Sequence, residues 1–330
     1  MLRSHQARPL LRLAFCFAAL TSTAAIQAQP TPVSPVQVTA GTDPVPPPTA
    51  AQHAPLPFSP TSVFWELRPQ DKRGTFAVRT YMPNFVLPVH YTDSINRYPS
   101  SPTQPALTQE NQYRQLGAKI QISLRTKVME GLFHPNADLW FAYTQRSLWQ
   151  VWNREDSAPF RSTDHQPEVI YVYPIPESMS RLPFDWRWRM LQGGWAHQSN
   201  GQSDPLSRSW DRTFVGLGFE RGEIGFGLKF YKRIPEGGTD DNPGITRYAG
   251  DTDVVLNWFP GSAIASMTWR THLASLANGS VQLDWTYPIN RDRNTGARWY
   301  VQLFTGYGES LLDYNHRQTS IGVGVSLFQF

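Results

Sequence analysis

From about residue 61 onward, apolar and polar side chains alternate in short stretches that are bounded by Asp, Asn, Gly and Pro. A period of two residues is the pattern of β-strands whose two faces meet different surroundings. No apolar run comes near the roughly 20 residues that a membrane-spanning helix needs. The pattern predicts an all-β antiparallel fold. Its twelve expected strands cover residues 80–91, 117–128, 138–151, 168–173, 185–198, 210–220, 224–233, 251–259, 263–270, 279–288, 298–308 and 319–329.

The connections between these strands alternate in length. Residues 221–223 form a short turn, whereas residues 154–167 and 235–250 form long polar loops. An even number of strands with alternating short and long connections is typical of bacterial outer-membrane barrels. Phe328 and Phe330 share a face at the end of the chain, as in many such barrels. A soluble β-sandwich would give a similar alternation, but the aromatic content and the N-terminal segment favour a twelve-stranded transmembrane β-barrel.

That N-terminal segment, residues 1–30, has the pattern of a signal peptide. Three arginines precede a short apolar stretch at 13–20, and small residues follow it. Its removal would change the formal charge from +4 to +4 − 3 = +1, so no nucleic-acid partner is expected. Cys16, the only cysteine, lies inside the segment, so the mature chain is expected to have neither disulfide nor thiol chemistry.

Residues 31–60 are rich in Pro, Thr, Ala and Gln. Such a composition cannot bury enough apolar surface to fold, so a disordered linker is expected. Residues 61–330 are expected to form one domain, the barrel.

One polar turn, between two of the expected strands, stands out for its chemistry. If residues 195–211 fold as an antiparallel hairpin centred near Asp204, His197 lies opposite Asp211 and Ser199 lies opposite Ser209. Ser199 and His197 are two residues apart and therefore share a face. The hairpin then brings together a hydroxyl, an imidazole and a carboxylate, which are the nucleophile, base and orienting group of a serine hydrolase. An inert polar hairpin at a rim is the alternative interpretation.

The face that carries this cluster is the more apolar one on both strands. Leu191 and Trp195 share it with His197, and Val215 shares it with Asp211. In a soluble protein this face would be the core, but in a membrane barrel it is the lipid face. A hydrolytic site there would suit a substrate that the membrane itself delivers.

Four blocks of sequence carry a resemblance to a known family. The run HQSNGQSDPLSRSWD at 197–211 closely resembles the active-site segment of the outer-membrane phospholipase A family. Residues 143–161, 239–248 and 306–315 resemble further blocks of that family, in the family's order. The resemblance implies an outer-membrane enzyme that hydrolyses acyl esters of phospholipids and lysophospholipids, with A1 and A2 activity.

The resemblance also implies roles for individual residues. Ser199 is the nucleophile and His197 the general base, while Asp211 stands where the family usually has asparagine. A Ca²⁺ ion helps to form the oxyanion hole, and its ligands correspond to the Ser207 hydroxyl, the Gln202 backbone carbonyl, and Ser157 from a partner subunit.

The active form implied by the resemblance is a homodimer. Gln145 matches a position of the family's dimer interface on the lipid face, although an interior-lining role is the alternative from its neighbours alone. Asp204 lies near the implied Ca²⁺ ligands, either as a source of charge or as a turn residue before Pro205.

A competing hypothesis is a channel or a catalytically inactive structural barrel in which Asp211 marks a decayed site. No G-x-S-x-G elbow, P-loop or H-E-x-x-H zinc motif is present in the sequence. His165 and His316 are expected to be loop residues.

Overall fold

A computed structural model describes residues 58–156, 158–291 and 296–327. The chain divides into two compact units, Met1–Leu56 and Pro57–Phe330, and all described residues belong to the second. The expected signal peptide and most of the expected linker lie outside the described residues, as do Ser157 and the terminal Phe330.

Nearly all of the described chain is antiparallel sheet. The strands are β1 (Val78–Thr80), β2 (Asn84–Thr92), β3 (Leu116–Glu130), β4 (Asp138–Trp149), β5 (Phe160–Pro174), β6 (Arg187–Ser199), β7 (Ser209–Arg221), β8 (Ile224–Ile234), β9 (Thr252–Trp258), β10 (Ile264–Thr271), β11 (Gly279–Pro288), β12 (Arg298–Gly306) and β13 (Gln318–Leu327).

The helices are short. They are α1 (Pro60–Trp65), α2 (Glu177–Ser180) and α3 (Ile245–Ala249), with 3₁₀ turns η1 (Pro69–Asp71), η2 (Arg154–Asp156), η3 (Pro183–Asp185) and η4 (Gly237–Thr239). No helix in the described part of the chain has the length and apolar character needed to cross a membrane.

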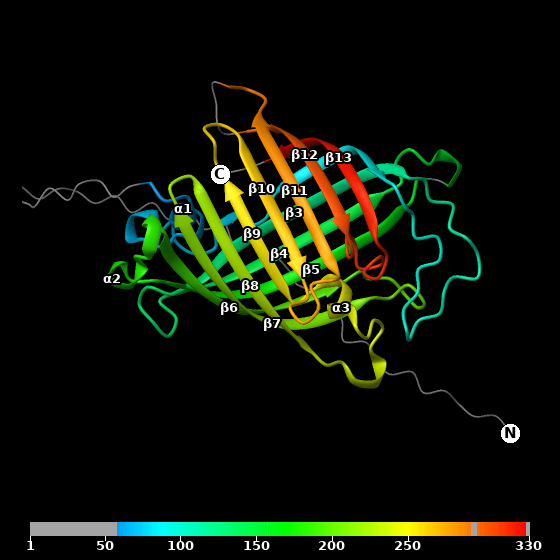
Figure 1. The fold of residues 1–330 in the computed structure, drawn as a ribbon, viewed down its shortest axis with the longest axis horizontal. Coiled ribbons are helices and arrows are strands. Elements are labelled where there is room, and N and C mark those ends of the chain that lie inside the picture. The colour runs from blue at the N-terminus through cyan, green and yellow to red at the C-terminus, as the bar shows by residue number, and fades with distance from the viewer. Residues whose placement is uncertain (1–57, 157, 292–295, 328–330) are drawn as a thin grey trace, which may run out of the picture. The chain divides into compact units, whose positions relative to one another are not determined.

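The sheet closes on itself as a barrel. Each strand from β2 to β13 pairs with its neighbours in sequence, β13 pairs with β2, and the pairing of β3 with β4 completes the ring (Figure 1). β1 and β2 both pair with β3 and are separated only by residues 81–83, so together they form the first expected strand with an interruption. The predicted twelve-stranded antiparallel barrel is therefore confirmed.

One predicted boundary was wrong. The fourth expected strand, at 168–173 after a polar loop at 154–167, corresponds to β5, but β5 begins at Phe160. Its polar first half alternates like the rest: Asp164 is buried and accepts hydrogen bonds from Ser162 Oγ (2.9 Å) and the Leu311 amide (2.8 Å). Polar residues extend this strand because the inside of the barrel is itself polar.

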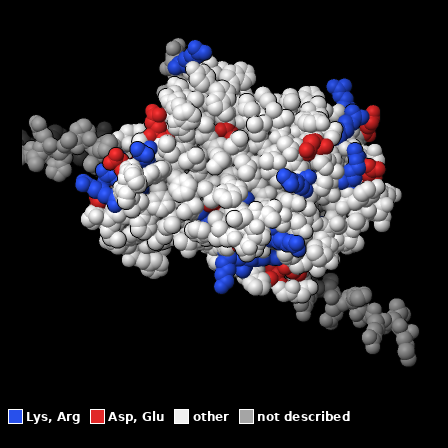
Figure 2. Space-filling view, viewed as in Figure 1, with Lys and Arg blue, Asp and Glu red and all other residues white. Residues whose placement is uncertain are grey.

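Charged side chains fill the interior in pairs. Burying an ion is costly unless a partner of opposite charge and further hydrogen bonds compensate it. The nearly inaccessible pairs are Lys119–Glu309, Lys127–Glu66 and Arg161–Asp313, each with an N–O distance of 2.8 Å. Apolar side chains such as Val215, Leu283 and Trp299 point outward and are 44–53% exposed. Figure 2 shows a broad face of uncharged residues between charged ends, and we interpret it as the lipid-facing wall of an outer-membrane barrel.

Helix α1 closes one end of the barrel. Ser59 caps it by accepting a hydrogen bond from the Ser62 amide (3.2 Å), and the Ser59 hydroxyl donates to Glu220 at the end of β7 (2.8 Å). Trp65 packs edge-on against Trp140, with 6.0 Å between ring centroids. The turn at 200–208, where the candidate chemistry lies, is at the opposite end of β7.

Candidate active site

The hairpin of β6 and β7 has the predicted register. His197 pairs with Asp211 and Ser199 pairs with Ser209 across the two strands. Asn200 holds the turn between them: its Oδ1 accepts from the Arg208 amide (3.0 Å), and its Nδ2 donates to the Leu206 carbonyl (2.8 Å). Gly201 follows with φ of +63°, a conformation that glycine adopts without steric cost.

His197 and Asp211 are in contact. His197 Nδ1 lies 3.1 Å from Asp211 Oδ1, and the two side chains are 33% and 30% exposed. The ring of Trp195 lies nearly parallel to the imidazole, with 6.4 Å between centroids. Ala196 and Phe214, on the opposite face, are buried. The cluster therefore lies on the outer wall, as the parity of the two strands predicted.

Ser199 shares this outer face and lies beside a second histidine, His165. The two residues pair across β5 and β6, and directly opposed residues have Cβ atoms about 4.5–5.5 Å apart. His165 Nδ1 is 2.7 Å from the Tyr143 hydroxyl. The expectation that His165 is a loop residue was wrong, for the same reason that β5 was drawn too short. His316 does lie in a loop.

Gln145 also lies on the outer wall. It pairs with His165 across β4 and β5, and its Oε1 accepts from the Tyr143 hydroxyl (3.3 Å). Thr144, on the opposite face, is buried inside the barrel. The interior-lining alternative for Gln145 is therefore wrong, and the half-buried amide interrupts an otherwise apolar face.

The residues implied as Ca²⁺ ligands gather at the turn. The Ser207 hydroxyl donates to Asp241 Oδ2 (2.5 Å), and Gln202 Nε2 donates to the Arg161 carbonyl (3.3 Å). Gln202 Oε1 is buried without a hydrogen-bond partner, although oxygens are the ligands that Ca²⁺ prefers. Ser157 lies outside the described residues. Among those that are described, no three His, Cys, Asp or Glu side chains form a metal-binding group. An all-oxygen donor set of this kind fits a weakly held hard cation.

Two ionisable groups near the turn are perturbed. Burial lowers the pKa of the Arg208 guanidinium, which donates to the carbonyls of Pro205 (3.0 Å) and Ser207 (2.6 Å). Burial also raises the pKa of Glu236, while Arg233 opposes this rise and the like charges of Asp240 and Asp211 add to it.

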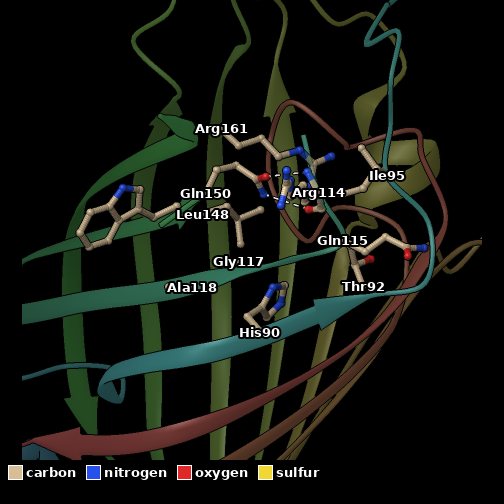
Figure 3. Close-up of a pocket in the computed structure, with 11 residues that line it drawn as sticks. His90, Thr92, Ile95, Arg114, Gln115, Gly117, Ala118, Leu148, Gln150 and Arg161 are labelled. Carbon is tan, nitrogen blue, oxygen red and sulfur yellow. Dashed lines mark hydrogen bonds between the residues drawn. The ribbon is translucent and has the colours of Figure 1, made fainter. Parts of the chain in front are cut away.

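Two cavities lie near the hairpin, and neither contains the candidate cluster. One, of about 10 Å³, lies at the rim between β2, β3 and β4 beside His90 and Arg161 (Figure 3). It has room for about one water. The other, of about 70 Å³, lies inside the barrel and is lined by Gln198, Trp210 and Arg212, among others. His197 and Asp211 lie outside both cavities, on the outer wall, where about a third of each side chain is exposed.

Comparisons with known proteins agree with this architecture. The family model for phospholipase A1 matches residues 61–327. A putative phospholipase A1 of Neisseria meningitidis is 38% identical over 295 residues, covering 88% of this chain and 75% of the relative. Phospholipase A1 of Escherichia coli K12 is 38% identical over 213 residues, covering 63% and 68%.

Solved structures are similar as well. Outer membrane phospholipase A from Escherichia coli superposes with a TM-score of 0.65 at 33% identity, covering 75% of this chain and 93% of that one. The Salmonella typhi outer membrane phospholipase, solved as a dimer with bound calcium, superposes with a TM-score of 0.67 at 32% identity, covering 76% and 92%.

Proposed function

Because this chain belongs to the phospholipase A1 family, we propose that its outer-wall hairpin hydrolyses the acyl esters of phospholipids and lysophospholipids at both the sn-1 and sn-2 positions. One observation carries the proposal. His197 contacts Asp211 at 3.1 Å on the outward face that they share with Ser199. The proposed nucleophile, base and orienting group thus face the membrane, which contains the phospholipid substrate.

The reaction is acyl transfer in two halves. Ser199 Oγ attacks the ester carbonyl carbon while His197 accepts the hydroxyl proton. The C–O bond to the glycerol then breaks, and the proton passes from His197 to the departing oxygen, which leaves as a lysophospholipid. Water attacks the acyl-serine, His197 takes its proton and returns it to Ser199, and the fatty acid is released. Asp211 accepts the Nδ1–H hydrogen bond, which leaves the other ring nitrogen to face the nucleophile, and stabilises the imidazolium by its charge.

The position of the site defines how the substrate arrives. Trp195 and Val215, on the same wall, are 37% and 51% exposed, so an acyl chain can lie along the barrel without leaving the membrane. The cost of placing Asp211 next to lipid falls when His197 pairs with it.

Calcium and a second subunit would complete the site. The Ser207 hydroxyl and the Gln202 backbone carbonyl, with Ser157 of the partner subunit, would hold the cation, which would supply positive charge near the developing oxyanion. The Salmonella typhi relative binds calcium as a dimer, and Gln145 offers an outward amide for such an interface. We therefore propose a calcium-dependent enzyme that is active as a homodimer.

The interior argues against the channel hypothesis. Lys119 and Glu309 are at most 1% exposed and bonded to each other, and the interior cavity measures about 70 Å³. Among the described residues, buried and hydrogen-bonded charges of this kind occupy the lumen, which disfavours an open water-filled pore.

Covalent labelling tests the proposal. The refolded protein is treated with an alkyl sulfonyl fluoride in the presence of calcium, and the modified peptide is identified by mass spectrometry. Label on Ser199 that is lost in Ser199→Ala but kept in Ser209→Ala, its partner in the hairpin, would support the proposal. Absence of label, or label that persists in Ser199→Ala, would contradict it.

A further inference from the structure

Behind the candidate cluster, on the inner face of the same hairpin, lies a second set of contacts. Gln198 stands between His197 and Ser199 on β6 and points the other way. Its Oε1 accepts hydrogen bonds from Trp210 Nε1 (3.0 Å) and Arg212 Nη1 (3.1 Å). Trp210 and Arg212 are the two residues that flank Asp211 on β7.

The two donors are themselves firmly anchored. Trp210 and Arg212 are each 5% exposed, and the guanidinium carbon of Arg212 lies 4.1 Å from the centroid of the Trp210 ring. Trp210 belongs to a buried cluster with Ile245, Leu311 and Tyr314. Through these contacts, the inner face of β7 packs against the loops that carry Ile245, Leu311 and Tyr314. The hydrogen bonds of Gln198 connect β6 to the same cluster.

We propose that Gln198 is a positioning residue, which fixes the spacing between His197 and Asp211 from inside the barrel. The proposal rests on the proposed function. The two faces of a strand move together, so a bond that joins residues 198, 210 and 212 on one face sets the separation of residues 197 and 211 on the other.

The surroundings explain why the strand ladder alone is insufficient. The contact lies in the last pairs before the 200–208 turn, and Gln198, Trp210 and Arg212 line the 70 Å³ interior cavity. Open space next to the three side chains leaves them room to relax when the bond is removed. Catalytic groups must be held to about 0.5 Å by packing and supporting hydrogen bonds, and Gln198 supplies such bonds at this strand end.

The test compares four variants of the full-length, refolded protein. Gln198→Leu removes the acceptor, and Gln198→Asn keeps the amide but shortens its reach. Gln198→Glu keeps the acceptor, and the arginines that line the cavity can offset its charge. Gln192→Leu is the matched control, because Gln192 is buried on the same inner face of β6 and bonds only weakly, to Met190 Sδ at 3.6 Å.

The readouts are kcat and KM on phospholipid in mixed micelles and the His197 ring resonances by NMR. For Gln198→Leu and Gln198→Asn, we expect kcat to fall about ten- to a hundredfold with KM unchanged, because misplacement rather than binding is affected. The chemical shifts of the His197 ring should change, since the imidazole loses part of its contact with Asp211. Gln198→Glu should stay within about threefold of wild type, and Gln192→Leu should match wild type.

Several outcomes would overturn the proposal. Folded Gln198→Leu or Gln198→Asn with unchanged kcat and unchanged His197 ring resonances would do so, and so would an equal loss in Gln192→Leu. If Gln198→Leu fails to fold, the smaller change in Gln198→Asn decides. If the wild type itself shows no turnover, the proposed function fails, while the His197 ring resonances still test the positioning role.

Discussion

His197 Nδ1 and Asp211 Oδ1 lie 3.1 Å apart across the β6–β7 hairpin, on the outer wall of a closed barrel. The strand register brings these two residues opposite each other, because they are direct partners. The register also assigns their shared face to the membrane side, opposite the buried Ala196 and Arg212. The pair thus explains how a site on the outside of a barrel can hold an oriented base without an enclosing pocket.

The identity of the orienting residue can be tested at Asp211. We expect Asp211→Ala to lower kcat about a thousandfold, since the imidazole loses its orienting acceptor. Asp211→Asn should remain within about tenfold, because a half-exposed amide can turn its oxygen toward Nδ1. Equal losses in both variants, measured on micellar phospholipid, would show that the carboxylate charge rather than the hydrogen bond is essential.

The calcium ligands can be tested at Ser207. We expect Ser207→Ala to raise the calcium concentration for half-maximal activity about tenfold, because a weak oxygen site loses one of its few protein ligands. Ser203→Ala is the control, since Ser203 is exposed in the same turn. Titration of activity against free calcium gives the answer, and an unchanged midpoint in Ser207→Ala would exclude Ser207 as a ligand.

The proposed dimer interface can be tested at Gln145. Gln145→Ala should weaken dimerisation about three- to tenfold in detergent with calcium, the effect of a single hydrogen bond in an apolar environment. Leu283→Ala, an outward residue of β11 that is 44% exposed, should leave dimerisation unchanged. Analytical ultracentrifugation measures both, and a stronger effect of Leu283→Ala would place the interface on another wall.

The close packing of the catalytic strand can be tested at Gly194. A Cβ there would lie 2.2 Å from the Val169 carbonyl oxygen and 2.5 Å from the Phe214 ring. Gly194→Ala should therefore destabilise the barrel by about 1–3 kcal/mol. Gly218→Ala, whose Cβ would meet only the flexible Met190 side chain, should cost less. Urea unfolding in detergent compares the two, and equal midpoints would contradict this order.

The sequence predicted most of the barrel because period-two alternation persists wherever one face meets lipid. The hairpin register followed from symmetry about Asp204, and the pairs His197–Asp211 and Ser199–Ser209 are as expected. The first half of β5 was missed because its inward-facing side chains are polar, like its outward-facing ones. Residues 161–167 therefore lack the alternation of apolar and polar positions and were predicted as a loop, together with His165.

The role of Gln198 was beyond the sequence for a different reason. A glutamine between a base and a nucleophile has no distinctive pattern, and its partners Trp210 and Arg212 are identified only when the inner face of the barrel is seen. The interruption of the first strand at residues 81–83 does have a local signal, because Pro83 has no amide hydrogen to donate to the sheet. Its carbonyl accepts a hydrogen bond from the Gln121 side-chain amide (2.8 Å).

The central claim is tested most directly by phospholipid hydrolysis in mixed detergent micelles, with calcium or with chelator, for wild type and Ser199→Ala. We predict turnover by wild type in calcium that disappears with chelator and in Ser199→Ala. A verified folded, dimeric wild type without turnover, or an active Ser199→Ala, would contradict the account.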